Sequence, residues 1–151
     1  TIEVASYQTS QLFVRTIFSL NPCLTMERVK FSKEFIFRAS PAILYQFLST
    51  PDCLIRWFCD QVHINGRMYT FEWNGAEEEA ELIEDHEEEL LRFHWEDADD
   101  EREYLEFNMD RSPVTGETIL VITDFCDADE VEDQKQLWVT QMEALRGVTG
   151  G

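Results

Sequence analysis

The sequence predicts an α+β fold in which a curved antiparallel sheet of about six strands packs against one long C-terminal helix. Three observations carry this prediction. The last segment, Asp127–Gly147, repeats its apolar residues at spacings of three, four and seven, as one side of a helix does. The stretches before it alternate between apolar and polar residues, as strands do. A helix of about eighteen residues is roughly 27 Å long, so it needs a sheet to cover its apolar side.

The chain is expected to begin its sheet with a strand at Arg28–Phe37, where one side is rich in phenylalanine. Ser40-Pro41 then provides an N-cap followed by proline in the first helical turn, which predicts a short helix over Pro41–Leu48. Thr50-Pro51 repeats this pattern and predicts a second short helix that extends through the Trp57-Phe58 pair. Two short helices therefore follow the first strand.

The remaining strands are separated by turn sequences. Asn65-Gly66 and Asn74-Gly75 are typical turn pairs, and the polar runs Asp85–Glu89 and Asp97–Glu103 indicate two further reversals. Strands are predicted around these turns at Val62–Trp73, Glu78–Glu84, Leu91–Trp95, Leu105–Met109 and Thr118–Cys126.

The final helix is expected to be capped by Asp127 or Asp129 and to end at Gly147. We interpret residues 26–147 as one domain and residues 148–151 as a tail. Residues 1–25 carry only two charges, Glu3 and Arg15, and have an irregular apolar pattern. We expect them to be an N-terminal extension that is not native to the domain or is partly disordered, with Met26 as the natural start. The alternative is an additional strand or helix packed on the domain.

The charge is strongly unbalanced, with 31 acidic against 12 basic residues and a formal net charge of −19. The segment Glu77–Glu103 alone holds fifteen acidic residues and two arginines. Such a surface repels a phosphate backbone and an anionic membrane surface, so we expect no nucleic acid partner. No apolar run approaches the ~18 residues needed to span a bilayer, so we expect no membrane insertion. The acidic segment is interpreted either as a solubilising face or as a docking surface for a basic protein.

The sequence contains no motif of a catalytic or metal site. Its four cysteines form no CxxC pair, which favours a reduced, cytoplasmic protein without a zinc site or disulfide framework. His63, His86 and His94 are not spaced as ligands, and His94 is expected to point to solvent. No nucleotide-binding or nucleophile motif is present, and the acidic runs lack the register of a calcium loop. We therefore predict no enzyme activity and no cofactor.

The order of elements resembles the helix-grip fold of START-like domains in the SRPBCC (Bet v 1-like) superfamily. As a set, the local motifs are similar to the small START-like proteins of Bacteroidetes, relatives of the C-terminal domain of the Hsp90 activator Aha1. The resemblance covers Met26 to about Gly147 and implies a cavity for lipids, sterols, polyketides or other apolar molecules. Its motifs are Phe31–Phe37, Ser40-Pro41, Leu54–Phe58, FEWNG at Phe71–Gly75, FHW at Phe93–Trp95, ITDF at Ile122–Phe125, and Trp138.

Two functions follow as hypotheses. The first is binding of an apolar small molecule or lipid between the sheet and the final helix, which a cavity below about 100 Å³ would contradict, since ligand pockets usually exceed ~300 Å³. The second is an acidic protein-interaction module with a packed core, chaperone-associated by analogy with Aha1. Nine large side chains are the candidate ligand-binding residues, and they could equally form an ordinary core: Trp57, Tyr69, Phe71, Trp73, Phe93, Trp95, Phe107, Trp138 and Met142.

Overall fold

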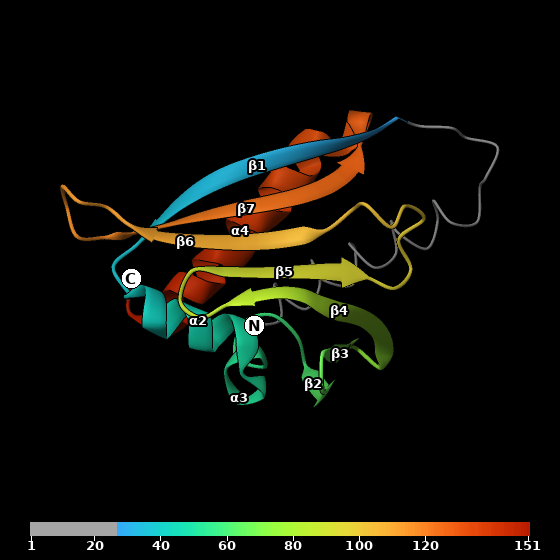
Figure 1. Ribbon diagram of the computed structural model, residues 1–151, viewed down its shortest axis with the longest axis horizontal. Helices are drawn as coiled ribbons and strands as arrows, with labels where there is room; N and C mark the ends of the chain where they lie inside the picture. Colours follow the sequence, from blue (N-terminus) through green and yellow to red (C-terminus); the bar gives the residue numbers. More distant parts are fainter. Residues whose placement is uncertain (1–26) are drawn as a thin grey trace.

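A computed structural model of the chain describes residues 27–151 (Figure 1). The expectations for residues 1–25 lie outside this range. The elements follow one another in the order β1 (Arg28–Phe37), α2 (Pro41–Ser49), α3 (Pro51–Leu54), β2 (Gln61–Asn65), β3 (Met68–Trp73), β4 (Ala76–His86), β5 (Leu90–Trp95), β6 (Leu105–Arg111), β7 (Thr118–Asp127), a 3-10 turn η1 (Ala128–Glu130) and α4 (Val131–Thr149).

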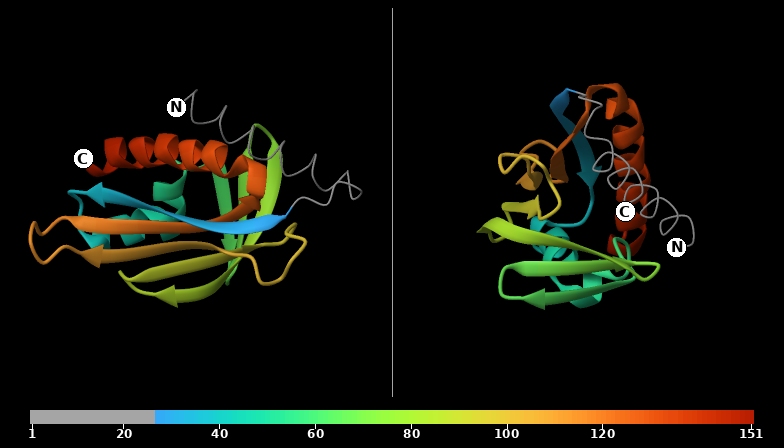
Figure 2. Two further views of the ribbon diagram at one scale, coloured as in Figure 1. Left: turned by 90° about the horizontal axis from the view of Figure 1, so that it is seen from above. Right: turned by 90° about the vertical axis from the view of Figure 1, so that its right-hand side faces the viewer.

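The strands form one antiparallel sheet in the order β1-β7-β6-β5-β4-β3-β2, and this confirms the predicted α+β fold. The turn at Asn65-Gly66 separates β2 from β3, so the described sheet has seven strands where about six were predicted. β1 and β7 pair along their whole length, from Arg28 opposite Asp127 to Phe37 opposite Thr118. Figure 2 shows the sheet curving from β1 to β2 and β3, with α4 against its inner face.

Alternation along the strands decides which residues form the core. Tyr69, Phe71 and Trp73 of β3 are buried, while Thr70 and Glu72 between them are only partly covered. β5 and β6 show the same period because neighbouring side chains in a strand point to opposite faces. The inner face is therefore apolar and covered by helices, and the outer face is polar.

α4 is the long predicted helix, but both of its ends differ from the prediction. Asp127 is still part of β7, and its carboxylate accepts a hydrogen bond from Arg28 and caps nothing. Gly147 lies inside the helix, which ends at Gly150, where φ is 94°. This left-handed conformation favours glycine, so Gly150 is the C-cap. Residues 148 and 149 consequently belong to the helix and not to a tail.

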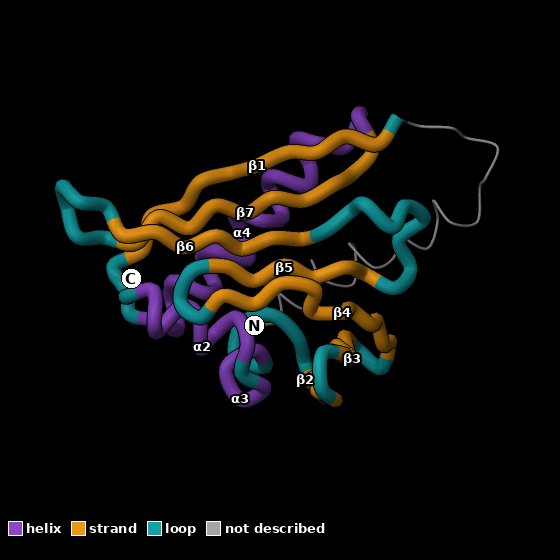
Figure 3. Tube along the Cα trace, viewed as in Figure 1, coloured by secondary structure: helices purple, strands orange, loops and turns teal. Residues whose placement is uncertain are grey.

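The short helices α2 and α3 lie at one end of the sheet, where α2 also contacts α4 (Figure 3). The predicted cap is confirmed, because the backbone N–H of Ile43 donates to Ser40 Oγ at 3.3 Å. α3 is shorter than predicted and ends at Leu54; turns follow over residues 55–58. One cause is that the Trp57 indole is drawn back to α2, where it donates to the Phe47 carbonyl. We call residues 41–59 the α2–α3 segment.

Candidate functional site

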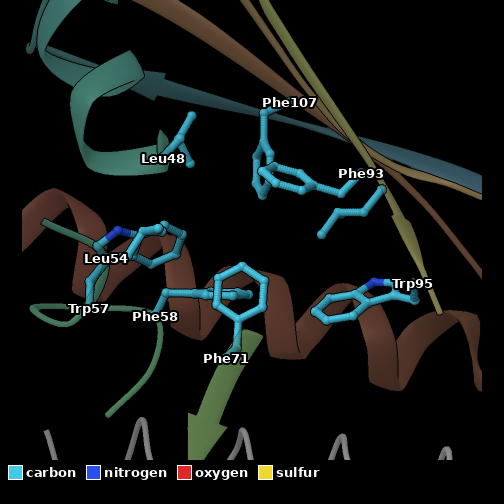
Figure 4. Close-up of a pocket in the computed structure, with 9 residues that line it drawn as sticks. Leu48, Leu54, Trp57, Phe58, Phe71, Phe93, Trp95 and Phe107 are labelled. Carbon is cyan, nitrogen blue, oxygen red and sulfur yellow. The ribbon is translucent and has the colours of Figure 1, made fainter. Parts of the chain in front are cut away.

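A pocket lies between the α2–α3 segment and the inner face of the sheet (Figure 4). Four of its lining residues come from the α2–α3 segment and five from β3, β5 and β6. The free space inside it is about 10 Å³, close to the volume that one water molecule needs. The lining consists of Leu48, Leu54, Trp57, Phe58, Phe71, Phe93, Trp95, Leu105 and Phe107.

The pocket brings together five of the nine candidate residues: Trp57, Phe71, Phe93, Trp95 and Phe107. α4 contributes no lining side chain, although the sequence placed the ligand between the sheet and this helix. The free space is also far below the limit of about 100 Å³ that we set for a preformed ligand cavity. This pocket beneath α2 and α3 is therefore too small to be the preformed ligand cavity that the sequence predicted.

The other four candidate residues are buried beside the pocket. Trp138 and Met142 of α4 are 1% and 0% exposed, and Trp138 packs edge-on against Phe107 with ring centres 5.8 Å apart. The indole N–H of Trp138 donates to Asp124 Oδ2 at 3.1 Å. Tyr69 and Trp73 belong to β3 and contact the α2–α3 segment from below. These four side chains therefore belong to the buried core and do not line the pocket.

Four lining residues were missed by the sequence reasoning: Leu48, Leu54, Phe58 and Leu105. Leu105 stands on the alternating face of its strand, so the period of two could have included it. The other three belong to the α2–α3 segment. Their apolar character was visible in the sequence, but the part of the sheet that they cover was not, because tertiary contacts decide it.

Phe58 is the lining residue of the α2–α3 segment that makes ring contacts both within the segment and with β3. Its ring centre lies 5.1 Å from those of Trp57 and Phe71, and 5.5 Å from that of Trp73. The contacts with Phe71 and Trp73 are edge-to-face, an arrangement that aromatic pairs favour. Phe58 therefore occupies space between the α2–α3 segment and β3 that a ligand could otherwise fill.

Hydrogen bonds from aromatic side chains fasten the α2–α3 segment to the sheet. The Trp73 indole donates to the Phe58 carbonyl at 2.7 Å, and the Tyr69 hydroxyl donates to the Ser49 carbonyl at 3.3 Å. At the surface, the hydroxyl of Tyr45 donates to Asp85 in β4. Burial, followed by this hydrogen bond, raises the pKa of Tyr45, so the phenol stays protonated.

The pocket is electrically neutral, because none of its lining side chains is charged or contains an ionisable group. The buried thiol of the α2–α3 segment belongs to Cys59, which follows Phe58 in the sequence, and burial raises its pKa to about 12. A thiol with such a pKa is a poor nucleophile at neutral pH. The site can therefore exclude water and pack against an apolar group, but it offers no acid, base or nucleophile.

The remaining buried charges have structural partners. The guanidinium of Arg28 binds Glu103 and Asp127, and these acidic groups raise the arginine's pKa. His94 lies on the outer face and is half-buried, and its Nδ1 lies 2.8 Å from the Glu103 carbonyl oxygen. Its side chain is therefore less free in solvent than the sequence predicted. Within residues 27–151, no group of three or more His, Cys, Asp or Glu side chains could hold a metal ion.

The outer face of the sheet carries acidic residues in two different settings. In β5 and β6, Arg92 binds Glu106 and stacks over Tyr104, with its guanidinium 4.2 Å from the ring centre. In β3 and β4, by contrast, Glu72 stands directly opposite Glu77. In the described part of the chain, neither glutamate forms an ion pair with a lysine or arginine. Like charges at such a position destabilise a sheet, so this region is a candidate docking surface.

Comparison with known proteins gives matches over most of the chain. A family model described as the START-like superfamily domain matches residues 25–151. A solution structure of a Bacteroides fragilis protein is 37% identical, with a TM-score of 0.61, over 82% of this chain and 92% of the other. The Aha1 dimer from Colwellia psychrerythraea is 16% identical, with a TM-score of 0.68, over 80% of this chain and 96% of the other. A search of curated proteins finds no match.

Proposed function

The chain belongs to the START-like superfamily, and we propose that it binds an uncharged apolar small molecule in the pocket beneath its α2–α3 segment. The observation that carries this proposal is the lining of nine apolar side chains without a charged group. A guest that buries its surface there gains about 25 cal/mol for each Å² removed from water. Because the free space is only about 10 Å³, binding requires a lining side chain to move.

Native mass spectrometry of freshly purified protein, followed by denaturing extraction, tests this proposal. We expect a bound apolar molecule of defined mass that is released on unfolding. A protein that is empty after purification and also takes up no apolar probe would overturn the proposal. The packed pocket would then be ordinary core.

A second candidate function is that of an acidic protein-interaction module. The observation that favours it is the Glu72–Glu77 pair on the outer face, together with the neighbouring Glu79. A basic partner would relieve the repulsion between these carboxylates. One protein of similar fold is named Aha1, but at 16% identity this likeness concerns the fold alone. A chaperone-associated role therefore rests on analogy.

Binding of a lysine-rich peptide at low salt and in 0.5 M salt tests the second candidate. We expect the variant with Glu77→Lys and Glu79→Lys to lose binding. The control variant, with Glu87→Lys and Glu88→Lys, has the same change in net charge, but its two substitutions lie in the β4–β5 turn, and it should keep binding. Equal losses in both variants would show attraction to net charge without a docking surface.

We also propose a cytoplasmic location. It is supported by Cys53, Cys59 and Cys126, which are free thiols in the structure. None of the helices within residues 27–151 is long and apolar enough to cross a membrane. Localisation of a tagged full-length chain by cell fractionation tests this part of the proposal.

A further inference from the structure

We propose that the pocket accepts one uncharged, ring-sized apolar group, and that this group enters by opening the α2–α3 segment while α4 stays in place. Phe58 is the side chain that yields the space. This inference rests on the proposed function and adds to it the size of the ligand, its charge and its route of entry.

The chemistry of the lining sets the ligand class. With no charged or ionisable side chain among its nine lining residues, the pocket has nothing to pair with a lipid head group, an amine or a carboxylate. Burying such a group without a partner is strongly unfavourable. A dry cavity of about 150 Å³ lined by Leu, Ile and Phe suffices for benzene, so displacement of one phenyl ring gives space for a group of similar size.

The position of Phe58 makes it the residue that can move. Phe71, Phe93 and Phe107 lie on β3, β5 and β6, and each of these strands is paired with a neighbour on both sides. Their backbone is therefore held by two ladders of hydrogen bonds. Phe58 follows the four-residue helix α3 and lies in a run of turns, where its N–H donates to the Leu54 carbonyl at 2.8 Å. A turn can shift without breaking the sheet.

The contacts of α4 and of the α2–α3 segment, the two helical covers of the sheet, indicate by which route the ligand enters. α4 has nineteen residues and buries Trp138, Met142 and Leu145 against the sheet. At the C-terminal end of the chain, the Gly151 carbonyl accepts a hydrogen bond from the Arg38 backbone N–H at 2.7 Å. From β3, the α2–α3 segment is held by single bonds from Trp73 and Tyr69 to backbone carbonyls. The segment consists of helices of nine and four residues followed by turns, so we expect it to open locally at a lower free energy than the nineteen-residue helix α4.

Fluorobenzene is a suitable probe, because ¹⁹F NMR lineshapes report its affinity and its association rate. The decisive comparison uses two matched variants, Trp73→Phe and Trp138→Phe. Each keeps a large aromatic ring and loses one buried indole hydrogen bond, the first to the α2–α3 segment and the second within the α4 side. We expect Trp73→Phe to raise the association rate about tenfold, because the lost bond no longer opposes opening. Trp138→Phe should leave the rate within twofold of the original.

Further measurements separate failure of the route from failure of the site. A larger increase for Trp138→Phe, or unchanged rates in both variants, would overturn the proposed route while leaving a ligand site. If Trp73→Phe does not fold, Tyr69→Phe replaces it, since it removes the other bond to this segment and is expected to raise the rate severalfold.

The charge and size of the ligand are tested separately. 4-Fluorobenzylamine and 4-fluorobenzoate should bind at least tenfold more weakly than fluorobenzene, and equal affinities would contradict the neutral ligand class. Phe58→Ala should bind fluorobenzene more tightly. If the unmodified chain does not bind fluorobenzene, the pocket is not a ligand site and the proposed function itself fails, even where the cavity created in Phe58→Ala binds the probe.

Discussion

The two helical covers of the sheet, α4 and the α2–α3 segment, are fixed by different interactions. α4 presents a continuous buried side, in which Trp138, Met142 and Leu145 are at most 1% exposed. The α2–α3 segment buries residues too, but its backbone carbonyls are held by aromatic donors, and a pocket remains beneath it. The nineteen-residue helix α4 has to separate as one unit, whereas the two short helices and the turns of the α2–α3 segment can open separately.

Because of this difference, we expect the two helical covers to have different roles in the same core. We expect the α4 side to supply cooperative stability and the α2–α3 side to be the place where the structure can adapt. A pocket of about 10 Å³ is compatible with ligand binding only on the side that can open. The following predictions test whether the two covers differ in this way.

The largest effect is expected from a matched pair of leucines. Leu145 in α4 is 0% exposed and Leu54 in α3 is 3% exposed, so both are buried and identical in chemistry. Leu145→Ala should lower the free energy of unfolding by about 4 kcal/mol, and Leu54→Ala by about 2–3 kcal/mol, because a site that can relax leaves a smaller cavity. Urea unfolding of both variants measures the difference. A larger loss for Leu54→Ala would reverse the comparison.

Stability above neutral pH provides the next test. Burial, followed by the charge of Asp124, raises the pKa of Cys126 to about 12, and Cys59 reaches about 12 chiefly through burial. A thiol with a raised pKa favours the unfolded state once pH exceeds its unfolded pKa of about 9. The stability that comes from keeping these two thiols protonated is therefore fully present below about pH 9. It is lost as the pH rises from 9 towards 12. We expect a loss of up to about 3 kcal/mol between pH 8 and pH 10.

Variants with a single cysteine replaced show how much of this pH-dependent loss of stability comes from each of the two thiols. In Cys126→Ala the pH-dependent loss due to that thiol should disappear completely. Cys59→Ala should change the slope less, because opening of the α2–α3 segment already lets Cys59 ionise without global unfolding. Chemical denaturation at several pH values measures both slopes, and identical slopes would argue against separate opening.

Thiol labelling compares the same two positions kinetically. In a background with Cys23 and Cys53 replaced by serine, iodoacetamide at pH 8 should modify Cys59 at least tenfold faster than Cys126. Both thiols are buried, and Cys126 lies on the same face of β7 as Asp124, which binds Trp138 of α4, so each thiol is expected to react only after the helical segment above it opens. Peptide mass spectrometry at several labelling times gives the two rates. Faster labelling of Cys126 would show that α4 is the more mobile cover.

The sequence predicted one side of the pocket better than the other. Phe71, Phe93 and Trp95 were identified because a period of two places them on the inner face of any such sheet. Leu48, Leu54 and Phe58 were missed, since the fit of two short helices onto the sheet depends on distant bonds such as Trp73 to the Phe58 carbonyl. The sequence likewise placed the helix end at Gly147, whereas α4 ends at Gly150, whose left-handed φ of 94° only the structure reveals.

The smallest expected effect comes from Gly147, which lies inside α4 with an exposed position. A Cβ atom there would meet nothing within 4 Å, and the residue has no positive φ. Gly147→Ala should therefore stabilise α4 by about 0.5–1 kcal/mol, because alanine loses less backbone entropy in a helix. Labelling of Cys126 should slow by up to about fivefold, while labelling of Cys59 stays unchanged. Equal slowing at both thiols would mean that α4 and the α2–α3 segment open together, and the molecule would then have one cooperative core.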